Sequence, residues 1–324
     1  MDLKDEFKTA AKYVHAMNFS TIDKPISFFE TTIRVIGGLV SAYEFSGDSQ
    51  LLDKAATMAD MLQPAYLSLS GFPYHKISLE NGHGLNPERY PDQCILAEVG
   101  SVQLEFGKLA YLANNHDYLD RAYDVIKKLM KNKPPVPGLY PFALDVEGGE
   151  YANVTASLGS KSDSFYEYLL KMYILFGDMH PFGDMYLESI DAVKKHLVKP
   201  VPFHDDMVFL ATLHPNNETT NEFDHLTCFA PGMLAMGSRV FNRPDDLALA
   251  KQLMKTCVHL YRTTTTGLSF EKVQFFTPAE FADLTQEALP NTAERLRQRG
   301  YTPLNPSYYL RPGKQLLLAS WLPK

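Results

Sequence analysis

Hydrophobic residues recur at helical spacing along most of the chain, and segment 25–46 shows this most clearly. The apolar positions of this segment are separated by four or three residues: Phe29, Ile33, Ile36, Val40 and Tyr43. That spacing predicts one buried stripe of an α-helix. A second stripe, one residue later, carries charged and small side chains: Glu30, Arg34, Gly37 and Ser41. Since each residue turns a helix by about 100°, this stripe is a separate face that can meet a polar ligand.

Glu30 has two interpretations at this point. Ser27 and Glu30 have the spacing of a capping box, in which the glutamate only satisfies a backbone N–H at the helix start. Alternatively, Glu30 takes part in a binding or catalytic site. The local sequence alone favours capping.

Further helices follow along the chain, and their connections alternate between short and long. The predicted helices are 4–17, 25–46, 49–62, 93–113, 118–131, 162–176, 182–198, 224–241 and 246–262, with less regular ones at 278–299 and 306–322. Strands are expected at 142–146 and 151–155, which form a hairpin around Gly148-Gly149, and at 208–213 and 268–276. Such an array of up and down helices is an all-α fold with small β-hairpins in its loops.

Charged residues occupy the first turns of helices that follow long connections. They are Glu30, Glu98, Asp163, Asp224-His225 and Arg311. Alternate helices of an up-down array run in the same direction, so their N-termini gather at one end. We therefore expect these residues to line one mouth, where helix N-termini attract anions and oxygen ligands. Because these residues all lie at the starts of helices that run in the same direction, a site role for Glu30 is as well supported as capping.

Composition excludes two classes of function. The chain has 324 residues and a net charge of −7, with no block of Lys or Arg, so nucleic-acid binding has no support. No run of 18 apolar residues occurs, so no transmembrane segment is expected in this chain. The first residues predict an amphipathic helix, and no signal peptide is expected.

Two of the three cysteines lie on consecutive predicted helices. Cys228 and Cys257 are nearly equidistant from the predicted turn at 242–244, so they lie level with each other and can face. A disulfide there and two buried thiols at a helix interface both remain open. Cys94 is expected to be buried, and no Cys/His spacing predicts a metal site.

Five motifs together resemble the class I α-1,2-mannosidases of glycoside hydrolase family 47. They are Ser27–Leu39, Leu96–Phe106, Gly159–Leu170, His225–Gly232 and Tyr309–Pro312. The resemblance extends over 3–312 and implies an (α/α)7 barrel. It further implies trimming of α-1,2-linked mannose from high-mannose N-glycans on glycoproteins, with inversion and with Ca²⁺, in the endoplasmic reticulum or Golgi.

The resemblance also implies residue roles. Glu30 matches the general acid and Asp163 a second acidic residue of the catalytic site. The matches to sugar-binding or supporting positions are Arg34, Glu98, Glu105, Glu167, His225 and Arg311. Cys228 and Cys257 match a family disulfide.

The chain departs from the family pattern in ways that predict an incomplete copy. We expect 1–312 to be a partial catalytic domain and 313–324 an unrelated tail, so the toroid should be open. The family's general-base glutamate is replaced by Gly313, and its Ca²⁺-binding threonine has no match, so no residue of this chain is assigned as a metal ligand. The polypeptide is therefore expected to be inactive. A catalytically dead glycan-binding protein and a plain helical scaffold are the alternatives.

Overall fold

The chain folds into two compact units. The computed structural model describes residues 3–177, 181–286 and 288–310. Unit 1 comprises Met1–Lys133 and Ala143–Asn153, and unit 2 comprises Pro134–Phe142 and Val154–Lys324. Because 134–153 is divided between them, the chain passes from unit 1 to unit 2, back and across again.

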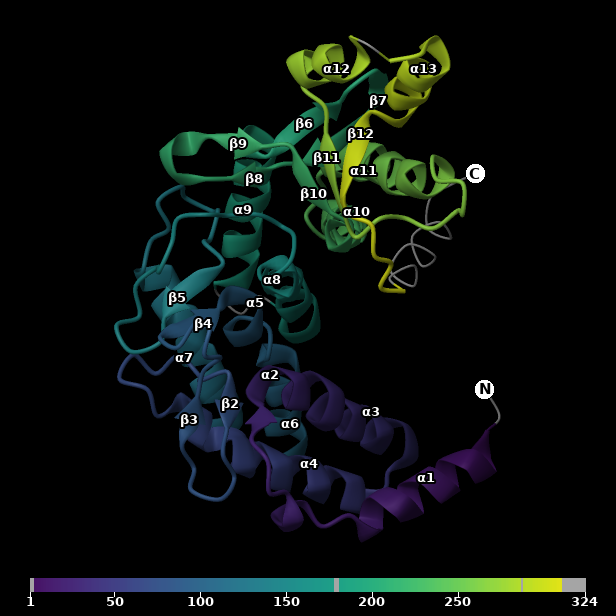
Figure 1. The fold of residues 1–324 in the computed structure, drawn as a ribbon. Coiled ribbons are helices and arrows are strands. Elements are labelled where there is room, and N and C mark those ends of the chain that lie inside the picture. Colours follow the sequence, from purple (N-terminus) through teal and green to yellow (C-terminus); the bar gives the residue numbers. More distant parts are fainter. Residues whose placement is uncertain (1–2, 178–180, 287, 311–324) are drawn as a thin grey trace. The chain divides into compact units, whose positions relative to one another are not determined.

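Unit 1 is mainly helical, with short antiparallel strands in its connections (Figure 1). Its helices are α1 (Lys4–Ala16), α2 (Phe28–Thr31), α3 (Gly37–Ser46), α4 (Ser49–Leu62), α5 (Leu96–Val99), α6 (Gln103–Ala113) and α7 (Asp117–Lys131), with short turns η1 (Phe19–Thr21), η2 (Thr32–Ile36) and η3 (Gln63–Tyr66). Its strands are β1 (Ile26–Ser27), β2 (Lys76–Ile77) and β3 (Gly84–Leu85), paired in that order, and β4 (Gln93–Ile95), paired with β5 (Ala143–Asp145).

The predicted helix 25–46 begins only at Phe28, because Ile26–Ser27 is strand β1. From there α2, η2 and α3 follow in unbroken succession, but the buried face differs in part from the prediction. Phe28, Thr32 and Ile36 are buried, whereas Phe29 and Ile33 are only half-buried. The cause is η2, a π-helical turn. A π turn holds more residues than an α turn, so the buried stripe steps back from 36 to 32 and 28.

The predicted helix 93–113 is wrong as a single element, because it is interrupted. Residues 93–95 are strand β4, and α5 and α6 are separated at Gly100–Val102. The buried Gln103 side chain stabilises this break, since its Nε2 donates to the carbonyl of Val99 at 3.2 Å and its Oε1 accepts the Val102 N–H at 3.0 Å. A side-chain amide thereby replaces the lost helical hydrogen bonds.

The predicted hairpin around Gly148-Gly149 forms only in part. β5 pairs mainly with β4, from Ile95 opposite Ala143 to Gln93 opposite Asp145. The expected second strand forms no regular ladder with β5, but Leu144 bridges Tyr151, and the N–H groups of Asp145 and Ala152 donate to the carbonyls of Glu150 and Ala143 at 2.8 and 3.0 Å. The pairing depends on a segment about 50 residues away in sequence, which local turn chemistry does not reveal.

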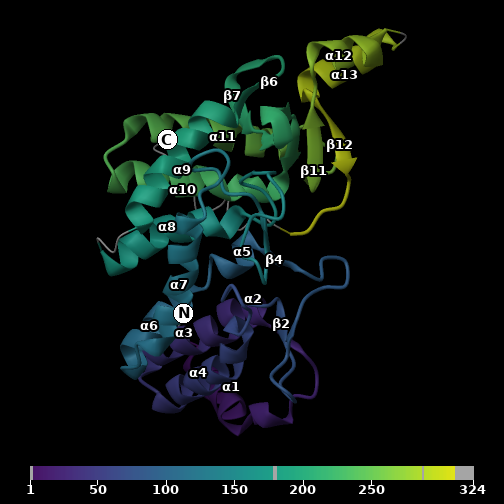
Figure 2. The ribbon, with the colours of Figure 1, turned by 90° about the vertical axis from the view of Figure 1, so that its left-hand side faces the viewer.

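Unit 2 combines helices with antiparallel sheets. Its helices are α8 (Asp163–Phe176), α9 (Phe182–His196), α10 (Ala230–Val240), α11 (Pro244–Arg262), α12 (Pro278–Thr285) and α13 (Pro290–Arg299), with turns η4 (Pro215–Asn217) and η5 (His225–Phe229). Its strands are β6 (Val198–Val201) with β7 (His204–Leu210), β8 (Thr212–Leu213) with β9 (Thr219–Thr220), and a sheet of β10 (Glu222–Asp224), β11 (Lys272–Phe275) and β12 (Tyr301–Asn305). Figure 2 shows α12 and α13 beyond the ends of β11 and β12.

A disulfide lies inside one apolar core of unit 2. Cys228 and Cys257 are bonded, with Cα atoms 5.9 Å apart, which confirms the pairing and rules out two free thiols. They pack in a cluster of buried residues: Val201, Phe209, Ala211, Phe223, Met254, Leu260, Val273, Phe275 and Tyr301. Cys94, in unit 1, is a buried free thiol, as predicted.

The helix-rich fold with small strands in its connections is confirmed within both units, whereas an open toroid stays a prediction. The expected helix 224–241 begins late, because Asp224 ends β10 and the α-helix starts only at Ala230. Of the expected helix 306–322, residues 306–310 are not helical, and the remainder lies outside the described residues.

Candidate functional site

Glu30 and Arg34 form an ion pair on the first turns of helix 28–46. Arg34 Nε donates to Glu30 Oε2, and the two side chains are 71% and 49% exposed, respectively. The Ser27 hydroxyl caps the helix by accepting the Glu30 N–H at 3.2 Å. The Glu30 carboxylate is therefore directed to Arg34, and only the serine half of the capping box is formed at this helix start.

Glu98 pairs with a histidine that the motifs did not single out. The Nδ1 atom of His75 lies 2.7 Å from Oε2 of Glu98, and both side chains are about one-fifth exposed. The His75 carbonyl accepts the N–H of Phe28 at 3.0 Å, and Phe28 is the first residue of the helix that carries Glu30. The structure thus joins Glu98 to the start of the Glu30 helix through one residue.

Glu105 lies against the polar stripe of the same helix. It is half-buried in the first turn of α6, and its Cγ would be 3.2 Å from a Cβ atom built on Gly37. The small residue predicted at position 37 therefore makes room for a carboxylate. Four of the predicted site residues, Glu30, Arg34, Glu98 and Glu105, lie around one helix of unit 1.

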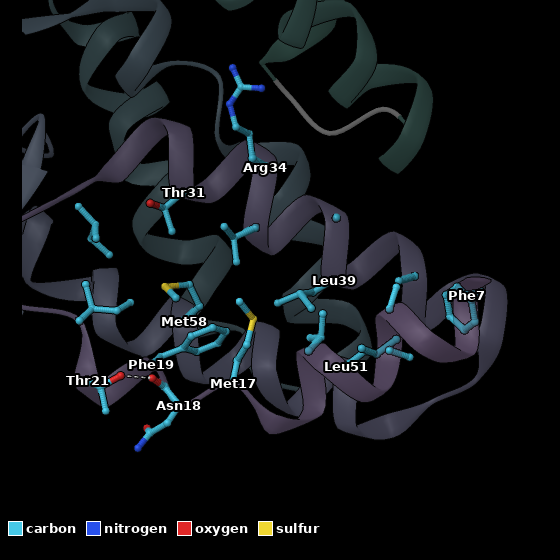
Figure 3. Close-up of a pocket in the computed structure, with 18 residues that line it drawn as sticks. Phe7, Met17, Asn18, Phe19, Thr21, Thr31, Arg34, Leu39, Leu51 and Met58 are labelled. Atoms are coloured by element: carbon cyan, nitrogen blue, oxygen red, sulfur yellow. Dashed lines mark hydrogen bonds between the residues drawn. The ribbon is translucent and has the colours of Figure 1, made fainter. Parts of the chain in front are cut away.

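A large, mostly apolar groove on unit 1 borders the Glu30–Arg34 pair. It has a volume of about 720 Å³ and lies between α1, helix 28–46 and α4. Its walls include Phe7, Val14, Met17, Leu39 and Met58. Arg34 contributes to the rim, but Figure 3 shows its guanidinium directed away from the other labelled side chains. Most of the lining is apolar, and its polar side chains come from Asn18, Thr21, Thr31 and Arg34, so the groove is not proposed as the sugar site.

Asp163 and Glu167 lie one turn apart on α8 in unit 2. Asp163 is the first residue of this helix, and its N–H donates to the Gly159 carbonyl at 3.0 Å. Glu167 forms an ion pair with Lys171, with Oε1 2.9 Å from Nζ. Both acidic residues are half-buried, so each side chain is partly covered by its surroundings and partly open to solvent.

His225 opens the turn η5 and is only 2% exposed. Its backbone N–H donates to the Glu271 carbonyl at 2.9 Å, and its ring packs edge-on against the Tyr261 ring, with centroids 5.3 Å apart. Burial raises the pKa of the Tyr261 hydroxyl, so this group keeps its proton. The bond to Glu271 holds the backbone of His225, and the contact with Tyr261 holds its ring.

Asp224, the residue before His225, contacts the loop that leads to Asp163. Its Oδ2 accepts the Ser160 N–H at 3.3 Å and would be 2.7 Å from a Cβ atom on Gly159. Burial raises the pKa of the Asp224 carboxyl, although the nearby Lys272 opposes this shift. A cavity of about 30 Å³, lined partly by Asp224 and Thr227, lies beside this contact.

Glu30, Glu98, Asp163 and His225 each lie in the first turn of a helical segment, as predicted. They fall into two groups, because Glu30 and Glu98 belong to unit 1 whereas Asp163 and His225 belong to unit 2. One mouth shared by both groups stays a prediction. Arg311 lies outside the described residues.

Sequence reasoning missed His75 as a member of these groups. His75 lies in an irregular connection without periodicity, and its signal is only a lone histidine in a loop. Asp224 was predicted together with His225, and the structure adds the hydrogen bond that it accepts from the Ser160 N–H. Among residues 3–177, 181–286 and 288–310, no group of three or more His, Cys, Asp or Glu side chains could hold a metal ion. No helix in these ranges is both long and apolar enough to cross a membrane.

Comparison with known proteins gives consistent matches. The model of glycosyl hydrolase family 47 matches residues 1–314. A mannosyl-oligosaccharide 1,2-alpha-mannosidase of Arabidopsis thaliana is 36% identical over 288 residues, which are 86% of this chain and 50% of the relative. The endoplasmic reticulum mannosyl-oligosaccharide 1,2-alpha-mannosidase of Homo sapiens is 34% identical over 280 residues, which are 85% of this chain and 39% of the relative.

A solved structure is similar as well. The alpha-1,2-mannosidase from Trichoderma reesei has a TM-score of 0.84 and 25% sequence identity, over 96% of this chain and 67% of that protein. The chain thus spans about half the length, or less, of the curated relatives described above.

Proposed function

Because the chain belongs to glycosyl hydrolase family 47, we propose that it binds high-mannose N-glycans through the polar site residues of its two units. The activity proposed for this site is hydrolysis of α-1,2-linked mannose. The observation that carries the proposal is the Glu30–Arg34 pair, which is exposed on a helix whose opposite face is buried. An exposed carboxylate–guanidinium pair offers both acceptors and donors to sugar hydroxyls.

Two carboxyl groups are the usual requirement for glycoside hydrolysis. In an inverting reaction, one carboxyl protonates the leaving oxygen, and another activates water on the opposite face of the sugar. We assign the first role to Glu30 and a second acidic role to Asp163. Glu30 is half-exposed, so the burial that favours a protonated acid would have to come from the bound sugar.

The remaining residues have roles in binding. Arg34 on the helix of Glu30, and Glu98 and Glu105 beside that helix, are proposed to contact the sugar or to support those contacts. In unit 2, Glu167 and the buried His225 are proposed to do the same beside Asp163. Arg311 is proposed as a further sugar contact on the basis of its motif, Tyr309–Pro312.

Turnover by this polypeptide is proposed to be weak or absent. Gly313 follows Arg311-Pro312, where the family resemblance places the glutamate that takes the proton from water. The loss of a general base typically lowers a rate by about 10² to 10⁴-fold. Asp163 could in principle substitute as the base. The proposed outcome is therefore glycan binding with little or no release of mannose.

One pair of measurements tests this function. A purified high-mannose N-glycan is titrated into the protein by calorimetry, with its mannose-free chitobiose core as the control, and released mannose is measured in parallel. Binding of the high-mannose glycan alone supports the proposal. Turnover near the rate of a complete family enzyme would contradict the proposed inactivity but would still support the glycan site. If neither glycan binds, the plain helical scaffold is the better interpretation.

Calcium is the ion that the resemblance implies, and the described residues do not fit it well. Calcium takes six to eight oxygen ligands, usually including several carboxylates, but no cluster of three or more His, Cys, Asp or Glu side chains among these residues could hold a metal. Repeating the glycan titration with calcium and with a chelator tests whether binding depends on the ion.

The secretory pathway is the proposed location, either the endoplasmic reticulum or the Golgi. The supporting observation is the Cys228–Cys257 bond, because disulfides persist mainly in oxidising compartments. Glycoproteins that carry high-mannose N-glycans are the proposed partners. Fluorescence microscopy of the tagged protein, with organelle markers, tests this location.

A further inference from the structure

His75 makes three polar contacts that connect separate parts of unit 1. Its carbonyl accepts the Phe28 N–H at 3.0 Å, and its own N–H donates to Oδ1 of Asn86 at 3.0 Å. Its ring Nδ1 lies 2.7 Å from Oε2 of Glu98. Both the backbone and the ring of this residue are therefore fixed, although it lies in an irregular connection.

The ring contact requires a hydrogen on Nδ1 of His75 whenever the Glu98 carboxylate is ionised. An ionised carboxylate has only acceptor atoms, so the hydrogen of this bond must reside on Nδ1 of His75. The two side chains are 22% and 21% exposed. The bond is thus partly shielded from water, yet the Glu98 carboxylate remains within reach of a ligand.

We propose that His75 is a positioning residue of the glycan site. Its ring fixes the Glu98 carboxylate, and its carbonyl fixes the first turn of the helix that carries Glu30, so the two acidic side chains keep a constant spacing. The part that concerns glycan rests on the function proposed above. The part that concerns the orientation of Glu98 rests only on the contacts of His75.

Three variants separate the ring bond from the rest of the residue. His75→Asn places an N–H donor two bonds beyond Cβ, where Nδ1 stands in histidine. His75→Gln places its donor one bond farther out, and His75→Ala has none. All three keep the backbone carbonyl and N–H, so the Phe28 and Asn86 contacts should persist and the variants should fold. Equal thermal midpoints for the variants would establish this.

Glycan titration of the full chain gives the first test. His75→Asn should bind the high-mannose glycan nearly as well as the unmodified protein. His75→Ala and His75→Gln should bind about tenfold more weakly, which corresponds to the loss of one hydrogen bond to a charged group. The proposal is overturned if His75→Asn is as weak as His75→Ala, or if His75→Ala binds normally.

Crystal structures of the variants give a second test that needs no ligand. The Glu98 carboxylate should stay within hydrogen-bond distance of residue 75 in His75→Asn and should turn away in His75→Ala. A Glu98 side chain that keeps its position in His75→Ala would overturn the positioning role. If the unmodified protein binds no glycan, the proposed function fails, and these structures still decide whether His75 positions Glu98.

Discussion

A Cβ atom on Gly37 would lie only 3.2 Å from Cγ of Glu105, so helix α3 and the Glu105 side chain approach each other this closely because residue 37 has no side chain. The next residue, Gly38, has no heavy atom within 4 Å of the same position. Both glycines are helical, without positive φ. The pair therefore offers a matched comparison within one turn.

Alanine at these two positions should have different effects. Gly38→Ala should stabilise the protein by up to about 1 kcal/mol, because alanine is the better helix former and meets no neighbour. Gly37→Ala should show little or no gain, since its Cβ displaces Glu105. It should also weaken binding of high-mannose glycan. Urea denaturation and glycan titration measure the two effects, and equal results for both variants would contradict the contact.

Arg34→Gln should separate binding from stability. The Arg34–Glu30 pair is exposed, and such i,i+4 pairs contribute only about 0.3–0.5 kcal/mol to stability. Loss of a charged hydrogen-bond donor to the sugar should weaken glycan binding by about 10 to 100-fold. Lys127→Gln is the control, because it breaks an exposed pair with Asp124 on α7 and should leave binding unchanged. A large loss of stability in Arg34→Gln would argue for a structural role instead.

His259 should make the stability of unit 2 sensitive to mild acid. Burial lowers the pKa of His259 below its usual 6.5, and the His204 ring, with its centroid 4.6 Å away, adds to this shift. The unfolded chain therefore binds this proton first as the pH falls, so stability is lost progressively below about pH 6.5. The slope from one proton is at most about 1.4 kcal/mol per pH unit.

His259→Gln is the matched variant for this prediction. The His259 Nε2 atom lies 2.8 Å from the Arg299 carbonyl, and glutamine places an amide N–H at a similar reach without a titrating group. Urea denaturation at several values between pH 5 and 7.5 should show a smaller slope for the variant. Parallel curves would mean that His259 does not carry the effect.

Removal of the disulfide should destabilise unit 2 strongly. Cys228 and Cys257 are separated by 29 residues, and closing a loop of that length stabilises a protein by about 3 to 4 kcal/mol in the chain-entropy model. The variant Cys228→Ala/Cys257→Ala should lose about this amount in urea denaturation. The unmodified protein, reduced while unfolded and refolded with reductant present, should match the variant. An unchanged midpoint in both would show that the bond contributes little.

The sequence identified the exposed stripe correctly, but of the predicted buried stripe only Ile36 and Val40 are buried. Glu30 and Arg34 are exposed as predicted, because their spacing on the helix surface does not depend on which turn is widened. The buried residues Phe28 and Thr32 were missed, since no pattern of hydropathy marks a π turn at η2. Periodicity can establish that a helix exists while its rotational phase depends on the surrounding packing.

Tertiary contacts explain the other differences. The break between α5 and α6 depends on Gln103, whose side chain also reaches the Ala122 carbonyl of α7 at 3.1 Å. The His75–Glu98 bond joins segments 23 residues apart, and neither residue belongs to a local pattern that includes the other. Motifs did place Glu98, Asp163 and His225 correctly at helix starts, because those positions are fixed by the order of elements along the chain.

The burial of the disulfide has a consequence for the biosynthesis of the protein. Cys228 and Cys257 are 3% and 1% exposed, and strands β11 and β12 contribute Val273, Phe275 and Tyr301 to the cluster around them. Both cysteines precede these strands in the chain, so they leave the ribosome first. Once the later strands have packed, an oxidase or a thiol catalyst has little access to the sulfur atoms. The oxidation machinery should therefore act on the nascent chain, before the last strands of this core are added.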